Sequence, residues 1–282
     1  TGDLGFNALE ELSINMGNRF INAGISEQNM LSVAAAFAKQ NIECWAYSIA
    51  PFCYARAFEQ IRNDICFHNL PVRIVGNGGG YGYGVMGPTH HAIEDYGILC
   101  SLPEIRSFIP VFNEDIDKII NKLRSHDGPA YLRLGLDEKP KNWVPPEYAA
   151  WRQIISGNGP SVVVTGSIAS SYIEKFIQLP NEFRPNMWIL SELPIYHQIP
   201  DELIKQIESS NRLIIVEEHV AAGGIAQQMA LSLIVNYNLS PKLSHSFAKS
   251  HIFEKYGSQK YLRKCSNLDP DNLCENIRKM CK

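Results

Sequence analysis

Apolar, β-branched runs alternate with segments of helical periodicity through the first half of the chain. Four such runs predict strands at residues 41–50, 72–77, 105–111 and 130–134. One helix is predicted over residues 51–69, with Pro51 in its first turn, and another begins after Asn113, a suitable cap. This alternation is typical of a parallel sheet that is covered by helices on both faces.

The alternation stops between residues 135 and 160, where the segment DEKPKNWVPPEY is polar and rich in proline. It resumes with predicted strands in the runs SVVVTG, MWIL and RLIIVEEH, which helical segments separate. We therefore predict an α/β protein with two doubly wound, mostly parallel sheets. The predicted domains are residues 1–140 and 160–282, joined by a linker at 141–159.

One predicted helix has apolar or small residues on almost every side. Its segment MLSVAAAFA, at residues 30–38, indicates a helix inside the packed protein. Ser26 is a suitable N-cap, and Glu27 follows it as the single carboxylate in the first turn. Such an acid can serve the helix dipole or can be a buried acid held for proton chemistry, and the pattern alone leaves both open.

A glycine-rich loop, GNGGGYGYGVMGPTHH at residues 76–91, follows a predicted strand and ends in two histidines. It is not a phosphate cradle of a known type, because no Gly-Lys-Ser/Thr follows and the strand and ribose acid of a dinucleotide site are missing. Glycine also lets the backbone approach a ligand closely. Since adjacent side chains point to different sides, we expect only one of His90 and His91 to reach the chemistry.

Composition and charge exclude several classes of function. The 282 residues are 45% apolar and 20% charged, as in an ordinary two-domain globular protein. A net charge of −3 offers no basic face for nucleic acid. No apolar run approaches the roughly 18 residues of a membrane span, and no secretory signal is evident, so we expect a cytoplasmic protein. Seven cysteines without a Cys-x-x-Cys pair predict reduced thiols.

Four stretches resemble transketolases and occur in the same order. They are GDLG at residues 2–5, RFINAGISEQNMLSVAAAFA at 19–38, GPTHHAIED at 87–95 and IIVEEH at 214–219. The resemblance spans nearly the whole chain. It implies a thiamine-enzyme pyrimidine-binding domain followed by a transketolase C-terminal domain. Deoxyxylulose-phosphate synthases and pyruvate dehydrogenase β subunits share this layout, but their motifs are less similar.

The resemblance also implies roles for particular residues. Glu27 would hydrogen-bond the pyrimidine ring of thiamine diphosphate, and His90 would reach the reacting carbon and the substrate. An aromatic ring would stack on the pyrimidine, and the spacing leaves open which one. The remaining cofactor-binding candidates are Asp3, Ile25, Phe52 and Tyr54.

One half of the cofactor site is absent from the sequence. Related enzymes hold the diphosphate through Mg²⁺ on a Gly-Asp-Gly motif and a later Asn, and no Gly-Asp-Gly occurs here. The resemblance implies that an N-terminal transketolase subunit carries this half, and that two copies of each subunit form a heterotetramer. The chain is then the C-terminal subunit of a split transketolase, which moves a two-carbon ketol unit between sugars.

Two departures from the transketolase pattern concern the substrate. Gly84, Val85 and Met86 stand where an acid usually precedes Gly-Pro-Thr-His, and Ile109 replaces the arginine that holds the acceptor phosphate. Losing such a clamp would cost roughly several kcal/mol. We therefore expect a different acceptor, such as a larger or nucleotide-linked keto sugar, with His91 and Arg106 as further substrate candidates.

Two other functions stay open at this point. One is a decarboxylating thiamine enzyme subunit, similar to deoxyxylulose-phosphate synthase or to the pyruvate dehydrogenase β subunit. The other is a non-catalytic paralogue that acts as a structural or regulatory partner.

Overall fold

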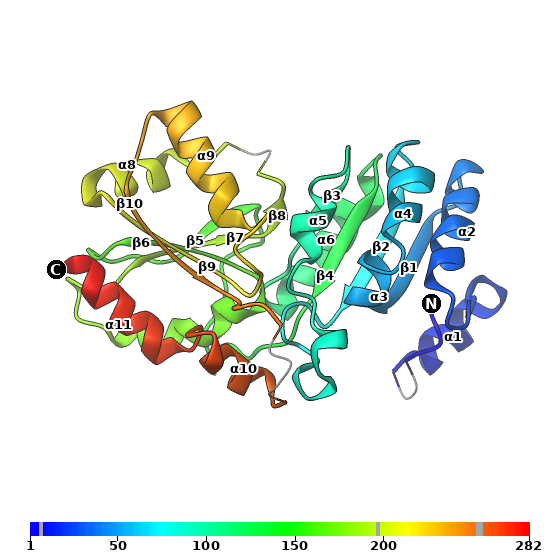
Figure 1. The fold of residues 1–282 in the computed structure, drawn as a ribbon, viewed down its shortest axis with the longest axis horizontal. Helices are drawn as coiled ribbons and strands as arrows, with labels where there is room; N and C mark the ends of the chain where they lie inside the picture. The colour runs from blue at the N-terminus through cyan, green and yellow to red at the C-terminus, as the bar shows by residue number, and fades with distance from the viewer. Residues whose placement is uncertain (6–7, 196–197, 252–255) are drawn as a thin grey trace.

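The computed structural model describes residues 1–5, 8–195, 198–251 and 256–282 (Figure 1). Two five-stranded sheets lie side by side, each flanked by helices. The predicted fold class, α/β with two mostly parallel sheets, is confirmed.

The first sheet has the strand order β1-β2-β4-β3-β8. Its strands are β1 Cys44–Ile49, β2 Val72–Asn77, β3 Arg106–Phe108, β4 Ala130–Leu134 and β8 Glu192–Leu193. All pairs are parallel except β3 with β8, which is antiparallel. The four strands predicted in the first half all form: β2 and β4 have the predicted bounds, and β1 and β3 are shorter than predicted. The fifth, β8, comes from the second half of the chain and joins the first sheet at its edge.

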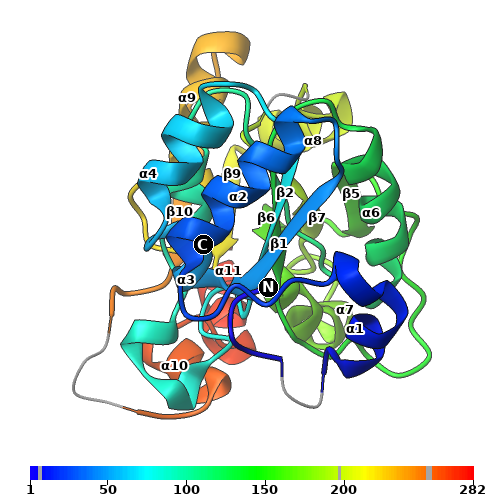
Figure 2. The same ribbon diagram turned by 90° about the vertical axis from the view of Figure 1, so that its right-hand side faces the viewer.

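Helices cover both faces of the first sheet, as Figure 2 shows from the side of β1. They are α2 Glu27–Lys39, α3 Ala50–Tyr54, α4 Phe58–Gln60, α5 Asp95–Leu99 and α6 Ile116–Ser125. The first helix, α1 Glu10–Met16, has no buried residue and does not cover the sheet. Neighbouring residues of β2 face opposite sides: Ile74 packs in the cluster that contains Leu31 of α2, and Val75 packs with Leu123 of α6. Both faces are therefore buried, which explains the nearly continuous apolar run of β2.

The helix predicted over residues 51–69 is divided. Pro51 lies in the first turn of α3, as expected, but α3 ends at Tyr54, and α4 is followed by a π-helical turn, Ile61–Cys66. The N–H groups of Ala55 and Arg56 both donate to the carbonyl of Pro51. This turn interrupts the helix and sets the direction of the Arg56 side chain.

Helix α2 is only half covered, which corrects the expectation that it has no wet face. Met30, Leu31 and four further residues are buried, whereas Val33 is 39% exposed and Phe37 is 37% exposed. Ser26 occupies the N-cap position, but its side chain makes no capping hydrogen bond. The apolar composition thus reflects two apolar faces, of which one is open in the single chain.

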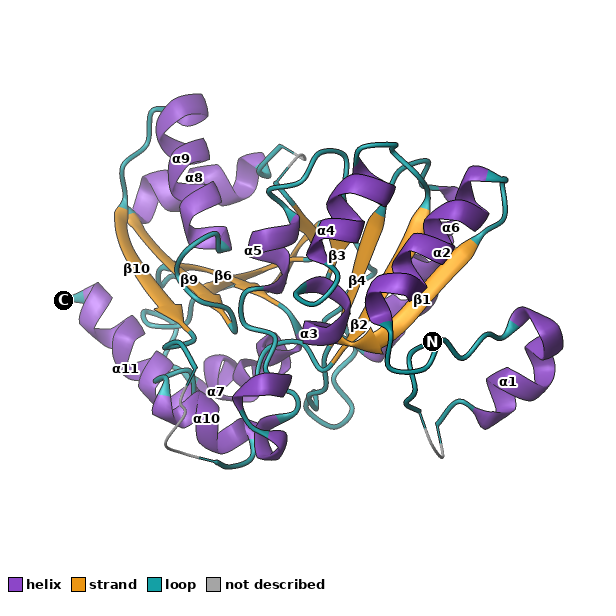
Figure 3. Cartoon of the chain, turned by 45° about the vertical axis from the view of Figure 1, so that its right-hand side comes forward, coloured by secondary structure: helices purple, strands orange, loops and turns teal. Residues whose placement is uncertain are grey.

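The second sheet has the strand order β10-β9-β6-β7-β5 (Figure 3). Its strands are β5 Trp151–Ile155, β6 Ser161–Thr165, β7 Asn186–Leu190, β9 Arg212–Glu217 and β10 Lys242–Phe247. Its helices are α7 Ile173–Gln178, α8 Asp201–Ser210, α9 Ile225–Tyr237, α10 Gln259–Cys265 and α11 Pro270–Cys281. Val162 packs with the residues of α7 and α11, while Val163 packs with those of α8 and α9 on the other face. No helix in the described part of the chain is long and apolar enough to cross a membrane.

Strand β5 lies inside the segment that was expected to be a linker, 141–159. It pairs antiparallel with β7 and carries Arg152, which is buried and donates two hydrogen bonds to Asp115. A charged residue at a buried position hid this strand in the sequence. Asp115 also accepts from the N–H groups of Val111 and Phe112, so this carboxylate, and not Asn113, satisfies the backbone before α6.

Candidate functional site

The two motifs nearest the N-terminus meet at Glu27. This residue begins α2, and its side chain is only 4% exposed. A Cβ atom built on Gly2 would stand 3.6 Å from Glu27 Oε1 and 3.3 Å from Ser48 Oγ. Gly2 itself is held by a hydrogen bond from its N–H to the carbonyl of Tyr47. The absence of a side chain at Gly2 thus leaves the Glu27 carboxylate close to the backbone at the end of β1.

Arg56 and Phe52 extend this site. Arg56 Nη1 donates to Glu27 Oε2 at 2.5 Å, and the guanidinium carbon lies 4.4 Å from the centre of the Phe52 ring. The His90 ring meets the Phe52 ring edge-on, with 5.2 Å between centroids. Four side chains therefore form a continuous row, in the order Glu27, Arg56, Phe52 and His90.

Sequence reasoning missed Arg56. The one available signal was a charge within an otherwise apolar stretch, PFCYARAF. Its contact with Glu27 depends on the turn after α3 and on the approach of α2, neither of which can be derived from residue spacing.

The two histidines of the loop point to different sides, as predicted for neighbours. His90 is half-buried beside Phe52, with its Nδ1 3.0 Å from the Thr89 hydroxyl. His91 is 1% exposed, donates from Nε2 to the Gly84 carbonyl at 3.2 Å, and packs on the edge of Tyr81. Burial lowers the pKa of His91 below its ordinary value. The structure does not bring His91 to the face of Phe52.

The two candidate aromatic residues are separated in the same way. Phe52 is half-buried and faces Arg56 and His90, whereas Tyr54 is 3% exposed. The Tyr54 hydroxyl donates to Glu94 at 3.0 Å, and burial raises its pKa. Of the two rings, only Phe52 therefore lies beside the ion pair of Glu27 and Arg56.

Asp3 follows Gly2 in the chain, and Ile25 precedes Ser26, the N-cap residue of α2. The Asp3 N–H donates to the Gly24 carbonyl, and its carboxylate accepts from Asn22 at 3.0 Å. Ile25 is 81% exposed, two residues before Glu27. Neither side chain is enclosed.

Arg106 does not join the other candidates. It begins β3, level with Arg73 at the start of β2, whereas His90 follows the end of β2. In a parallel sheet the N-terminal ends of the strands lie on one side and the C-terminal ends on the other. Arg106 therefore lies at the N-terminal ends of the strands, and His90 lies beyond their C-terminal ends. It lines a polar cavity of about 440 Å³ together with Asn69, Glu104, Ser125, His126, Asp127 and Gly128.

Ile109, which replaces the expected arginine, is 1% exposed and packed in the second-sheet cluster.

The glycine-rich loop packs against the second half of the chain. A Cβ on Gly84 would meet the backbone of residues 257–259 at 2.6–2.8 Å, and one on Gly80, where φ is +67°, would meet the Glu218 carboxylate at 2.6 Å. These glycines are needed because the loop lies directly on residues 257–259 at Gly84 and on the Glu218 side chain at Gly80.

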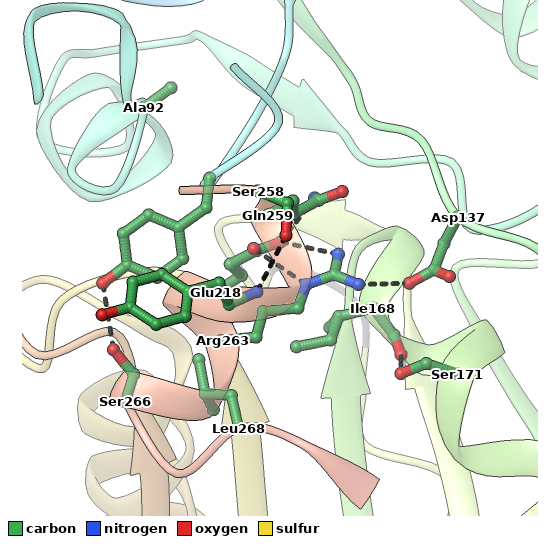
Figure 4. A network of polar contacts seen from close by, with 12 residues as sticks. Ala92, Asp137, Ile168, Ser171, Glu218, Ser258, Gln259, Arg263, Ser266 and Leu268 are labelled. Carbon is green, nitrogen blue, oxygen red and sulfur yellow. Dashed lines mark hydrogen bonds and ion pairs between the residues drawn. The ribbon is translucent and has the colours of Figure 1, made fainter. Parts of the chain in front are cut away.

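A buried ionic network holds that contact (Figure 4). Arg263 donates to both oxygens of Glu218, at 2.9 and 3.0 Å, and to Asp137. Arg133 donates to the carbonyls of Ala92 and Glu218, both at 3.0 Å. The IIVEEH motif is thus explained by contacts between the two halves, next to the loop that carries His90.

Glu217 and His219 complete the contact between the halves. The Tyr96 hydroxyl of α5 donates to Glu217 at 2.6 Å, and the Gly97 N–H donates to His219 Nε2 at 3.1 Å. Glu217 also accepts from the N–H groups at the start of α9. The second half therefore fixes the segment that follows His90 and His91.

The row can bind a flat nitrogen heterocycle. Glu27 offers a carboxylate to the ring edge, Phe52 offers an aromatic face, and Ser48 Oγ is fully buried beside Gly2 without a hydrogen bond among the described residues. These groups fit the pyrimidine half of thiamine diphosphate. No cluster of His, Cys, Asp and Glu in the described ranges could hold a metal ion.

The chain is similar to several known proteins. Residues 5–138 match the family model described as the transketolase pyrimidine binding domain. One of the subunits of apulose-4-phosphate transketolase from Actinobacillus succinogenes is 26% identical over 264 residues, which are 92% of this chain and 83% of that protein. A transketolase C-terminal section of Methanocaldococcus jannaschii is 25% identical over 277 residues, 94% of this chain and 83% of that protein. A solved structure described as a split gene transketolase, inactive beta4 tetramer, matches with a TM-score of 0.82 and 24% identity, over 100% of this chain and 90% of that one.

Proposed function

We propose that the chain is a member of the transketolase family, as the C-terminal subunit of a two-component, thiamine-diphosphate-dependent transketolase. The observation that carries the proposal is the row of Glu27, Arg56, Phe52 and His90 beyond the ends of β1 and β2, because it offers groups for one half of a thiamine site. The reaction is the transfer of a two-carbon ketol unit between sugars, and we expect it in the cytoplasm.

Each residue of the row has a role in this proposal. Glu27, nearly excluded from water, holds the proton that is shared with a pyrimidine nitrogen, and Phe52 supports the face of that ring. Asp3 and Ile25 border the cofactor at the rim. His90 donates hydrogen bonds to the substrate oxygens from its free Nε2 edge and orients the reacting carbon. When bound, thiamine diphosphate supplies the electron sink for cleavage of the carbon–carbon bond.

An N-terminal subunit supplies the other half of the site. No Gly-Asp-Gly occurs in the chain, so we assign the diphosphate and Mg²⁺ to that partner. The relatives from Actinobacillus and Methanocaldococcus are also named as one part of a transketolase, which supports this division. Two copies of each subunit would form a heterotetramer, with the exposed apolar residues Val33, Phe37 and Phe67 near its axis.

The acceptor in this proposal is a larger or nucleotide-linked keto sugar. The loop before Gly-Pro-Thr-His has Val85 and Met86 exposed in place of an acid, and Ile109 is buried where an arginine would hold a phosphate. Both changes remove polar contacts to a small sugar phosphate, and the exposed Val85 and Met86 give the loop an apolar surface.

Calorimetry tests the division of the site. The chain alone should bind thiamine diphosphate weakly, and addition of the Gly-Asp-Gly subunit with Mg²⁺ should restore tight binding. Tight, Mg²⁺-dependent binding by the chain alone would contradict the proposal. Light scattering of the mixture should give two copies of each subunit, and a fully active one-to-one heterodimer would exclude the paired arrangement. Turnover of pyruvate as the sole donor would instead support the decarboxylating alternative.

A further inference from the structure

Arg56 makes two contacts that a pyrimidine ring would need. Its Nη1 donates to Glu27 Oε2 at 2.5 Å, and its guanidinium lies 4.4 Å from the centre of the Phe52 ring. The Arg56 side chain is 44% exposed, while that of Glu27 is 4% exposed. A solvent-accessible cation therefore covers both the carboxylate and the aromatic face.

A guanidinium resembles an aminopyrimidine in the features that matter for these contacts. Both groups are flat, both have N–H donors at the edge, and both stack on an aromatic ring. A pyrimidine that made both contacts from this side would meet the guanidinium, because Arg56 already occupies Glu27 Oε2 and one face of the Phe52 ring.

We propose that Arg56 occupies the pyrimidine position in the free subunit and must swing out of it before the cofactor binds. This inference rests on the function proposed above. Arg56 then controls cofactor binding, since the pyrimidine ring has to displace the Arg56 side chain from Glu27 and Phe52.

The surroundings of Arg56 support such a movement. It stands in the turn at residues 55–57, after α3 has ended, and its exposed side chain has room to leave. Because Arg56 is 44% exposed, water can solvate its guanidinium once it has left Glu27, and a cofactor whose diphosphate is already held by the partner subunit can take its place. In the free subunit, the same ion pair avoids an uncompensated charge on the enclosed carboxylate.

The Arg56→Ala variant of the full chain tests this inference, with the neutral pyrimidine half of thiamine, 4-amino-5-hydroxymethyl-2-methylpyrimidine, as the probe. Because the probe has no positive charge, a change in its affinity does not report the removal of charge repulsion. An NMR titration should show binding to Arg56→Ala that is roughly three- to tenfold tighter than to the wild type. A structural defect would weaken binding, so a gain cannot come from partial unfolding.

Arg62→Ala is the matched control, because Arg62 is exposed on the following segment and, among the described residues, its side chain hydrogen-bonds only its neighbour Asn63, through Nη1. It should bind the probe as the wild type does. Unchanged or weaker binding by Arg56→Ala would overturn the inference. If the wild-type complex with its partner fails to bind thiamine diphosphate, the proposed function fails instead, so the two failures can be told apart.

Discussion

Replacing each of the two adjacent histidines by alanine should damage different properties of the protein. His91 is 1% exposed, and its ring packs on Tyr81 and donates to the Gly84 carbonyl at 3.2 Å. His91→Ala leaves a cavity and a carbonyl without its donor, which should lower the free energy of unfolding by about 2–4 kcal/mol. His90 is only half-buried, so His90→Ala should cost less than about 1 kcal/mol.

Turnover should follow the opposite order. His90 lies 5.2 Å from Phe52, measured between ring centroids, on the face assigned to the cofactor. Its removal should lower kcat of the reconstituted complex by about 10²- to 10⁴-fold, whereas His91→Ala should retain most of kcat once the folded fraction is taken into account.

Urea unfolding of each variant and steady-state kinetics well below both unfolding midpoints measure the two effects. The reasoning is refuted if His91→Ala is no less stable than His90→Ala, or if His90→Ala keeps kcat within about threefold of the wild type.

Two further predictions concern the contacts between the two halves of the chain. Arg263→Met leaves Glu218 and Asp137 without their shared cation and should cost about 3–5 kcal/mol in urea unfolding, while Lys264→Met, at an exposed neighbour, should cost almost nothing; equal effects would contradict the role of the network. The bridge from His251 Nε2 to Glu94 Oε1, at 2.6 Å, predicts a pH dependence. Its hydrogen bond to Glu94 raises the pKa of His251, so this contribution is complete below the ordinary value of 6.5 and is lost as the pH rises through the raised pKa. Burial acts to raise the pKa of Glu94, but the bond and charge of His251 outweigh it and lower the pKa, so its contribution is present above 4.5 and is lost as the pH falls. The difference in unfolding free energy between the wild type and His251→Asn should therefore be larger at pH 6 than at pH 8, and a constant difference would exclude the ionic bridge.

The sequence was sufficient to predict those strands whose buried positions are occupied by apolar residues. β2 is apolar on both faces, so its run of Val and Ile identified it. β5 was missed because Arg152 is buried by pairing with Asp115, a contact between residues far apart in the chain. Strand β8 has only two residues, which is too short for an alternating pattern. It forms because it pairs with β3, a contact that the sequence does not show.

The sequence predicted those residues of the candidate site that belong to recognisable motifs. Glu27, Phe52 and His90 come close together in the structure, but the sequence could not choose between Phe52 and Tyr54, because their orientations depend on the packing of α3. Arg106 was expected to be a substrate residue near His90, but it lies at the N-terminal ends of the strands, on the opposite side of the sheet from His90. Arg56 could not be predicted, because its position depends on a break in a helix that the periodicity presented as continuous.

The Glu27→Gln variant in the reconstituted complex tests the central claim most directly. The amide keeps the shape of the side chain but cannot share a proton with the pyrimidine nitrogen, so assembly and the binding of thiamine diphosphate should persist while turnover falls by about 10²-fold or more. Light scattering, calorimetry and a ketol-transfer assay on the same preparation measure these three properties. Turnover within about threefold of the wild type, in a complex that still assembles and binds the cofactor, would contradict the account.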